Sequence, residues 1–482
     1  MESTETFYWS DGRAPIEDLD EVSTVRVYGM ASAMLGLQYC WAVQNGWATS
    51  VLLELGLSKR WVAAAWLAGP LAGLVMQPLV GVVSDRWRGR LGRRCPFVWG
   101  GALGTAAALL AFAYASAVAR CLPGVSALAV AMIAFWSLDF SINAVQAALR
   151  ALIYDQVPAA RQEGGNGALA FYTAAGTIVG YGLGGARLNG RLLPSGWFAT
   201  DAQALLVLGA VLVLVSAAVT VAASVSRDRQ RTEGDVADAL TAAAADAKTS
   251  VQQMQQRWRE AAATVRAAPH PFWHVFLIQL FSWFAWFALF VYASSWFGVE
   301  VYGGEPHATP DSAARRRYDT GVRQANRAFA AQNVLAALYA AALPHLPCEL
   351  GSWHSCTIKY LFAQLVQAAA LLLMPLLGAN RAWLATALLI SLGVPWASTM
   401  TLPWAIVGRH VQSAAYRSDA GLYAATLNAS QCLSEILVSV LGAGIVRGDD
   451  GGGVPDRQWV LLLLGGVSAA VGAGLVAVYR VS

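Results

Sequence analysis

Apolar residues run in long blocks along this chain, and short polar segments separate the blocks. Twelve blocks are long enough to cross the hydrocarbon core of a bilayer, which takes about 20 residues of helix. They lie at residues 26–53, 61–83, 96–118, 125–152, 165–186, 202–225, 271–297, 325–345, 357–378, 382–406, 419–445 and 457–480. The pattern predicts an all-α, polytopic membrane protein with twelve transmembrane helices.

The longest polar segment, residues 226–270, lies between the sixth and seventh spans. It is rich in alanine and charged residues, so we expect a partly helical linker in water or along the membrane surface. Six spans on either side of it suggest two similar six-helix bundles with a substrate site between them near mid-membrane. We therefore expect an N-terminal tail at 1–25, bundles at 26–225 and 271–482, and this linker between them.

Composition excludes an ordinary soluble enzyme. Hydrophobic residues make up 57% of the chain and charged residues 13%, against about 45–50% and about 25% in soluble proteins. The loops carry no nucleophile–base pair, which argues against an enzyme, and no long basic tract that would bind nucleic acid. His345, Cys348, His354 and Cys356 fit no standard zinc spacing, so no metal or other cofactor is expected.

The polar first 24 residues lack a signal-peptide pattern, so the first span would act as the insertion signal. Five Arg residues follow the second span, and the central linker carries seven Arg or Lys residues. Such residues are enriched in cytoplasmic loops, so we expect both termini in the cytoplasm. Four Arg residues before the eighth span argue the other way, and the two stronger clusters outweigh them. They are Arg315, Arg316, Arg317 and Arg323.

The run GVVSDRWRGRLGRR at residues 81–94 joins the second and third spans. It resembles, with small variations, the loop signature of the major facilitator superfamily. A carboxylate at a helix end accepts hydrogen bonds from Arg and from a neighbouring helix N-terminus, so this loop is a candidate conformational latch. The alternative is that its arginines anchor the loop to anionic lipid. The latch candidates are Gly81, Asp85, Arg86, Gly92, Arg93 and Arg94.

A second set of polar residues lies on one face of the fourth span, within an arc of about 60°. Its members are Asp139, Asn143, Gln146 and Arg150. A carboxyl group is costly in the hydrocarbon region unless it faces water or a partner, so Asp139 suits reversible proton binding on a water-accessible path. Arg150 lies about 16 Å away along the helix axis and could bind sugar hydroxyls or neutralise Asp139 through an intermediary. The alternative is a structural polar seam in which Asp139 is permanently paired with another helix.

Two other spans carry polar residues at helical spacing. Asn428, Gln431 and Glu435 share a face of the eleventh span, where Glu435 is either a second proton site or a neutral, hydrogen-bonded group. In the first span, amides next to aromatic rings suit a sugar, whose hydroxyls meet amides and whose apolar face stacks on a ring. These are Gln38, Trp41, Gln44 and Asn45, with Trp47 beyond. The alternative for each is ordinary hydrogen bonding between helices.

Short motifs in a shared order over about 400 residues resemble the sucrose and α-glucoside proton symporters of the major facilitator superfamily. The motifs are GLQYCWAVQ at 36–44, WLAGP at 66–70, QPLVG at 77–81, GRRCPF at 92–97, LD at 138–139 with Asn143, RAL at 150–152, WFAWF at 283–287, WFG at 296–298, YDTGVR at 318–323 and LN at 427–428. In that family the acid of the fourth span is regarded as the proton carrier and the Arg beyond it as part of the binding machinery. The resemblance implies these roles for Asp139 and Arg150.

Several positions depart from the plant members of the family. Ser294 and Ser295 stand where plant sucrose carriers usually have Asp, and Lys59 replaces a loop His. Gln44 stands where members outside plants often have Glu, and Glu435 where the family commonly has Gln. Ser294, Ser295 and Lys59 are closer to the fungal and protist branch, and the differences leave the choice of sugar open.

The resemblance and the site residues together imply a proton-coupled symporter of a disaccharide or α-glucoside of the sucrose or maltose type. The implied partners are a small sugar, a proton and the lipid bilayer, with no nucleic acid, and the chain is expected to act as a monomer. We expect it in the plasma membrane, with the vacuolar membrane as the alternative. Two other functions stay open: an uncoupled or outward-directed sugar carrier of an internal membrane, and a sugar sensor that does not transport.

Overall fold

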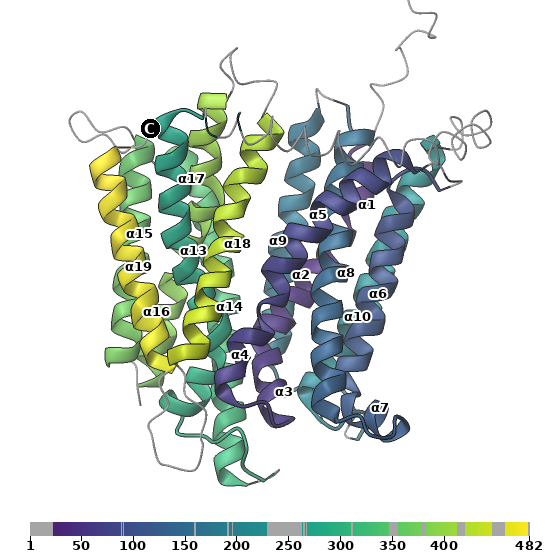
Figure 1. Ribbon diagram of the computed structural model, residues 1–482, viewed down its shortest axis with the longest axis vertical. Helices are drawn as coiled ribbons and strands as arrows, with labels where there is room; N and C mark the ends of the chain where they lie inside the picture. The colour runs from purple at the N-terminus through teal and green to yellow at the C-terminus, as the bar shows by residue number, and fades with distance from the viewer. Residues whose placement is uncertain are drawn as a thin grey trace, which may run out of the picture.

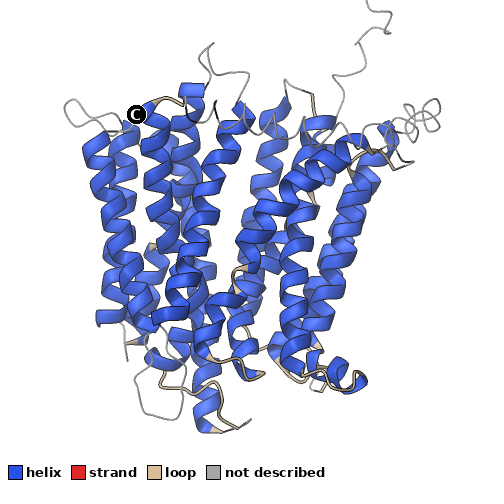
Figure 2. Cartoon of the chain, in the orientation of Figure 1, coloured by secondary structure: helices blue, strands red, loops and turns tan. Residues whose placement is uncertain are grey.

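The computed structural model describes residues 23–87, 89, 91–158, 161–189, 192–194, 196–228, 263, 266, 268–309, 312–346, 355–377, 381–411, 420–445 and 458–480. Most of the predicted tail and of the linker fall outside these residues, as do Arg88, Arg90, Cys348 and His354 and the side chains of Lys59, Asp85 and Arg86. Within the described residues all regular secondary structure is helical (Figure 2).

Six spans form an N-terminal bundle, drawn in purple to blue in Figure 1. The first is α1 (Thr24–Ala31), α2 (Ala33–Val43), the π-helix η2 (Gln44–Ala48) and α3 (Thr49–Glu54), and the second is α4 (Lys59–Ala65) with α5 (Ala68–Arg86). The others are α6 (Cys95–Ala113), α8 (Ala127–Gln156), α9 (Gln162–Gly184) and α10 (Asp201–Asp228), with the short α7 (Ala115–Cys121) between α6 and α8.

Six further spans form the C-terminal bundle, drawn in green to yellow in Figure 1. They are α13 (His270–Trp296) with the π-helix η5 (Phe297–Val301), α14 (Ala313–Ala342) followed by the 3₁₀ turn η6 (Leu343–His345), α15 (Ser355–Leu377), α16 (Ala382–Ser391) with α17 (Gly393–Val411), α18 (Ala420–Ile445) and α19 (Gln458–Tyr479). The predicted two bundles of six helices are therefore confirmed.

Eight of the helices in the described part of the chain are long and apolar enough to be recognised as membrane spans from length and composition. The other four spans are α1–α3, α9, α14 and α18. Three of these four carry side chains that contact the opposite bundle, described below. Since such contacts use hydroxyls, amides and guanidinium groups, the spans that line the interface between the bundles are less apolar than those that face lipid.

The eighth span differs from its prediction. The sequence pattern placed it at 325–345, whereas α14 already begins at Ala313. The Ser312 side chain accepts a hydrogen bond from the Arg315 backbone N–H at 3.1 Å and caps the helix. Four Arg residues that the pattern assigned to a loop, Arg315 to Arg317 and Arg323, therefore lie on a helix.

The spans alternate in direction, so the molecule has two ends. We call the end where α1 begins and α19 finishes the terminal face, and the opposite end, with α3 and α7, the distal face (Figure 1). Small residues let the helices of a bundle approach closely. A Cβ at Gly101 of α6, for example, would lie 3.2 Å from the Ser141 carbonyl oxygen of α8.

Candidate functional site

Asp139 lies in the middle of α8 and is 3% exposed. The Gln44 side chain, at the start of the π-helix η2, donates a hydrogen bond from Nε2 to Asp139 Oδ1 at 3.0 Å. Within the described residues, Asp139 Oδ2 is buried without a hydrogen-bond partner, and so is Gln44 Oε1. Asp139 forms no ion pair with any residue that the structure describes. Among the described residues, the carboxyl group is thus paired with a neutral amide and with no fixed cation.

An amide cluster continues from Asp139 along the same face of α8. Asn143 Nδ2 donates to the Asp139 carbonyl oxygen at 2.9 Å. Gln77 of α5 donates from Nε2 to Asn143 Oδ1 and to Gln146 Oε1, at 3.2 Å in each case. Gln77 was not among the predicted site residues; its signal in the sequence is an amide inside an apolar span.

Arg150 lies one helical turn beyond Gln146 towards the terminal face, and its side chain is exposed. It is eleven residues from Asp139 on a continuous helix, about 16 Å along the axis. The two charges are therefore separate groups on one helix face, as their spacing predicts.

Glu435 of α18 brings a second buried carboxyl group to Asp139, from the other bundle. Its side chain is 9% exposed, and the two acids are close enough to interact electrostatically. Glu435 packs against Gly69 of α5, where a Cβ would lie 2.7 Å from Glu435 Oε1. Asn428 and Gln431, on the same helix, are partly buried.

The first-span amide Gln38 lies against α9. Thr177 Oγ1 donates to Gln38 Oε1 at 3.4 Å, and Gln38 Nε2 contacts the Met34 sulfur at 3.6 Å. Trp41 is partly buried against the hydrophobic core. In this conformation Gln38 takes part in a contact between helices, and its role with a substrate stays a prediction.

The C-terminal bundle contains a polar cluster that the sequence analysis did not single out. The Ser282 hydroxyl of α13 donates to Gln367 Oε1 at 3.0 Å and accepts from Gln364 Nε2 at 3.1 Å. Trp286 donates from Nε1 to the Thr399 hydroxyl of α17 at 3.3 Å. Next to this cluster, the partly buried Trp396 ring of α17 makes an edge contact with the Trp286 ring at 4.9 Å between centroids.

The loop between α5 and α6 forms an ion-paired contact at the terminal face. Arg94 is 7% exposed, donates from Nε to Asp155 Oδ2 at 2.8 Å, and hydrogen-bonds the Ser84 hydroxyl. Arg93 approaches the same Asp155 oxygen at 3.1 Å. We call Ser84, Arg93, Arg94 and Asp155 the terminal latch. It fastens α8 to the α5–α6 loop.

Two glycines of the loop signature have different roles. Gly92 has φ +79°, a left-handed conformation that only glycine adopts at little cost. At Gly81, in contrast, a Cβ would meet no atom of the described residues within 4 Å. Gly81 is therefore not held at a close contact between the described helices in this conformation.

The two bundles are joined near the distal face by polar contacts from α14. Arg315 forms ion pairs with Glu54 of α3 at 2.8 Å and with Asp319 of its own helix at 3.0 Å. The Tyr318 and Ser50 hydroxyls lie 3.1 Å apart. Arg327 donates from Nε to the Gly185 carbonyl oxygen at 2.8 Å.

Asn326 of α14 adds a contact that is completely buried. It is fully buried and donates from Nδ2 to the Gly46 carbonyl oxygen of η2 at 3.3 Å. A Cβ at Gly46 would lie 2.9 Å from Asn326 Cγ, and one at Gly184 of α9 would lie 3.1 Å from the same atom. The Asn326 amide thus fits between two glycines of the other bundle. We call these contacts of Arg315, Tyr318, Asn326 and Arg327 the distal gate.

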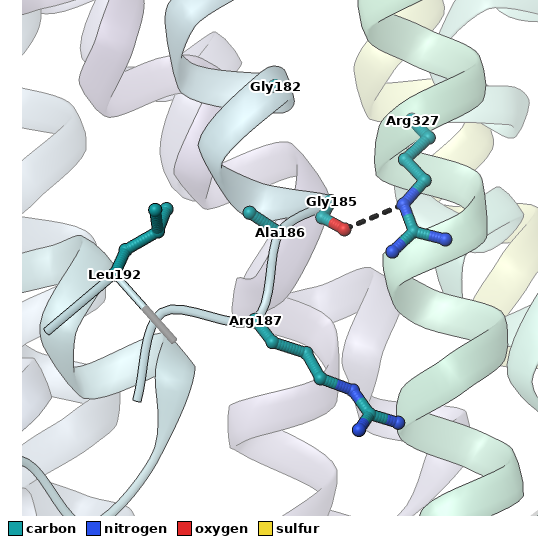
Figure 3. Close-up of a pocket in the computed structure, with 6 residues that line it drawn as sticks. All are labelled: Gly182, Gly185, Ala186, Arg187, Leu192 and Arg327. Carbon is teal, nitrogen blue, oxygen red and sulfur yellow. Dashed lines mark hydrogen bonds between the residues drawn. The ribbon is translucent and has the colours of Figure 1, made fainter. Parts of the chain in front are cut away.

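A cavity of about 340 Å³ lies beside the distal gate, between α9 and α14 (Figure 3). It is lined by Gly182, Gly185, Ala186, Arg187, Leu192 and Arg327. None of these residues belongs to the group around Asp139, so this cavity is separate from the buried acids.

Comparison with known proteins agrees with this architecture. A family model described as Major Facilitator Superfamily matches residues 27–439. The chain belongs to this superfamily. Its members are membrane transporters and not enzymes. Sucrose transport protein SUT2 of Oryza sativa subsp. indica is 28% identical over 86% of the chain and 85% of the relative, and sucrose transport protein SUC4 of Arabidopsis thaliana is 26% identical over 92% and 86%.

A solved structure of a D-xylose-proton symporter shares the fold. It aligns with a TM-score of 0.60 and 14% identity over 93% of this chain and 96% of that one. The polytopic, all-helical transporter architecture predicted from the apolar blocks is thereby confirmed.

Proposed function

We propose that this transporter carries a disaccharide or α-glucoside of the sucrose or maltose type together with a proton. The names of the plant relatives, sucrose transport proteins at 26–28% identity over most of both chains, support the sugar. The motif order described above supports the same class. The observation that carries the proton coupling is the Asp139 carboxyl group, buried and hydrogen-bonded to an amide.

A buried carboxylate is costly because it loses hydration, and proteins usually offset this cost with a nearby cation. The described residues provide Asp139 with only the neutral Gln44, while Glu435 adds a second acid from the opposite bundle. Uptake of a proton removes charge from this pair and its release restores it. We assign proton binding to Asp139, with Glu435 as a second titrating group whose environment changes when the bundles move apart.

The sugar is assigned to the polar residues next to these acids. Amides and a guanidinium group bind hydroxyls, and an indole face stacks on the apolar side of a sugar ring. The proposed sugar-binding residues are Gln38, Trp41, Gln44, Asn143, Gln146, Arg150 and Asn428. They come from both bundles, so binding would occur at the interface that opens and closes.

The terminal latch and the distal gate are proposed to alternate in controlling access to the site. In this conformation the distal gate joins the bundles through Asn326 and the Arg315–Glu54 ion pair. The proposed latch residues are those of the loop signature, Gly81, Asp85, Arg86, Gly92, Arg93 and Arg94, to which the contacts add Ser84 and Asp155.

We infer that the terminal face, where α1 begins and α19 ends, is cytoplasmic, and with it both termini. The Arg-rich loop between α5 and α6 lies at this face, and basic residues are enriched in cytoplasmic loops. The Arg residues at the start of α14 argued for the opposite orientation. That argument weakens because Arg315 and Arg323 face acids of the other bundle, Glu54 at 2.8 Å and Asp201 at 3.6 Å. We also propose that the protein acts as a monomer in the plasma membrane and that it lies closer to the fungal and protist branch of the sucrose and α-glucoside symporters than to the plant carriers.

Uptake of labelled sucrose and maltose by proteoliposomes, with and without an imposed proton gradient, tests the function. A gradient should drive accumulation and sugar should drive proton entry. Asp139→Asn should abolish gradient-driven accumulation but preserve sugar exchange, since it keeps size and polarity while removing the titrating group. Glu305→Gln, which changes an exposed distal carboxylate, is the control.

Each of the other outcomes would indicate a different function. Sugar flux that ignores the proton gradient would indicate an uncoupled carrier. Sugar binding without flux would indicate a sensor. Normal accumulation by Asp139→Asn would refute the assignment of the proton to that residue.

A further inference from the structure

The pair formed by Gln44 and Asp139 leaves two buried oxygen atoms without a donor. One hydrogen bond joins Gln44 Nε2 to Asp139 Oδ1 at 3.0 Å, while Gln44 Oε1 and Asp139 Oδ2 have no partner among the described residues. A buried acceptor without a donor costs about 1–3 kcal/mol. Both atoms accept hydrogen bonds, so a single donor shared between them would satisfy both.

A proton on Asp139 Oδ2 supplies that donor. The carboxyl O–H then donates to Gln44 Oε1, while the Gln44 N–H continues to donate to Oδ1. A primary amide and a carboxylic acid complement each other through two such hydrogen bonds, whereas the carboxylate and the amide share only one. The Gln44 side chain therefore fits the protonated acid better than the ionised one.

Gln44 is also the first residue of the five-residue π-helix η2. Single π turns inside α-helices are rare and frequently mark functional sites. Asn45 hydrogen-bonds Tyr181 of α9, Trp47 donates from Nε1 to the Gly184 carbonyl oxygen at 3.1 Å, and the Gly46 carbonyl oxygen accepts from Asn326. One turn of helix thus connects Asp139 to the distal gate.

The fit at the gate is close enough for a small displacement of η2 to matter. Asn326 is fully buried, and neither Gly46 nor Gly184 has room for a Cβ against it. Packed interfaces of this kind tend to have discrete arrangements and not a continuous range. A change in how Gln44 is held would therefore favour or disfavour the closed arrangement as a whole.

We propose that Gln44 is a positioning residue that senses the proton on Asp139 and transmits its presence through η2 to the distal gate. This proposal rests on the proton coupling proposed above and adds a role for a residue that does not itself titrate. It assigns the opening and closing of the gate to a change in hydrogen bonding at one amide.

Among the described residues, few other titratable groups face this pair. From α18 come Glu435, which interacts with Asp139, and Cys432, which lies near Gly73. From α2, Tyr39 and Cys40 point instead to α10, at the Leu205 and Gly209 carbonyl oxygens.

Several other charged or titratable groups that the structure describes on the packed helices lie or pair elsewhere. Arg94, before α6, is paired with Asp155 near the end of α8, and Glu54 of α3 with Arg315. Tyr181 of α9 hydrogen-bonds Asn45, and Arg150 of α8 is exposed three turns away from Asp139. The pH response assigned to the gate therefore belongs to Asp139, with Glu435 acting on it.

The variant Gln44→Met tests the proposal, because methionine keeps the length of the side chain and removes both hydrogen-bonding atoms. Gln279→Met is the matched control: both glutamines are 2% exposed, and among the described residues Gln279 accepts a hydrogen bond from Tyr360, within the other bundle. Two quantities are measured at acidic and neutral pH. They are sucrose uptake and hydrogen exchange of the gate segments 44–56 and 315–329, corrected for the intrinsic exchange rate.

In the wild-type protein and in Gln279→Met, hydrogen exchange of the gate segments and sucrose uptake should both change with pH. In Gln44→Met the pH dependence of hydrogen exchange in the gate segments should be lost. If hydrogen exchange of the gate segments depends on pH in Gln44→Met as it does in the wild-type protein, the proposal is overturned.

A double variant that exchanges the two groups provides a second test. Gln44→Glu with Asp139→Asn recreates an acid and an amide at the same place, with the proton carrier now at position 44. It should regain pH-dependent gate exchange that Asp139→Asn alone lacks. A folded double variant that responds no more than Asp139→Asn would also overturn the proposal.

Failure of the proposed function is distinguishable from failure of this inference. If the wild-type protein itself shows no proton-driven uptake and no pH-dependent exchange, the symport proposal fails and takes the role of Gln44 with it. If the wild-type protein shows both and Gln44→Met is indistinguishable from it, only the role of Gln44 is wrong.

Discussion

Gly46 is the position where a single methyl group should change the conformational equilibrium of the transporter. In the closed distal gate its carbonyl oxygen accepts a hydrogen bond from Asn326, and a Cβ would lie 2.9 Å from Asn326 Cγ, within η2 packed between two helices. Gly46→Ala should therefore leave each bundle intact and penalise the state in which the two meet.

The size of the penalty follows from the two interactions affected. Overpacking by one methyl group costs about 1–3 kcal/mol, and loss of the hydrogen bond to Asn326 costs about 0.5–1.5 kcal/mol. Together they disfavour the closed gate by about 2–4 kcal/mol. Since 1.4 kcal/mol corresponds to a tenfold change, the ratio of open to closed gate should rise roughly 30- to 1000-fold.

Alkylation of a cysteine inside the gate measures this ratio. Ser50 is 2% exposed and contacts the Tyr318 hydroxyl, so Ser50→Cys should react with a maleimide only when the gate opens. The reporter is placed in a Cys121→Ala background, because Cys121 is exposed, and studied in nanodiscs. Gly46→Ala should accelerate the reaction strongly.

The control is Gly182→Ala, on the same face of the molecule, where a Cβ would meet no atom of the described residues within 4 Å. It should leave the labelling rate unchanged. Equal rates in Gly46→Ala and Gly182→Ala would show that the close fit around Asn326 does not keep the gate shut, and the reasoning would be wrong.

Two further predictions concern ion pairs at the two faces. Asp155→Asn should lower the free energy of unfolding by about 1–3 kcal/mol, because it leaves the Arg94 guanidinium, only 8% exposed, without its carboxylate; Arg93→Ala, whose side chain is 47% exposed, should cost under about 1 kcal/mol. Thermal unfolding in detergent compares the two variants. An equal loss of stability would contradict the conclusion that Asp155 stabilises the protein mainly through the buried Arg94. Glu54→Gln should raise the labelling rate of the Ser50→Cys reporter by only about 1.4- to 5-fold, since a partly exposed ion pair contributes about 0.2–1 kcal/mol. An effect as large as that of Gly46→Ala would mean that Arg315, and not Asn326, dominates the gate.

The membrane-spanning architecture could be read from the sequence because hydropathy is summed locally. Twenty apolar residues are enough to specify a span whatever surrounds them, and all twelve predicted spans are helical in the structure. The start of the eighth span was missed because its first turns carry arginines, whose charge hides a helix that is stabilised by contacts with the other bundle.

The shared face of Asp139, Asn143 and Gln146 could also be predicted, because the period of 3.6 residues fixes which side chains of one helix point the same way. What these side chains contact could not. Gln44 and Asp139 are 95 residues apart in the chain, and Gly46 and Asn326 are 280 apart. Neither separation leaves a local pattern.

The sequence by itself thus determined that the chain crosses a membrane, how many times it does so, and which helix faces are polar. The tertiary structure decided that Asp139 meets an amide, that Arg94 pairs with Asp155, and that Asn326 fits between two glycines. The physical reason is one of scale. Burial of a whole span is favoured by many residues acting together, whereas each of these contacts is worth about 1 kcal/mol and depends on the position of a few atoms.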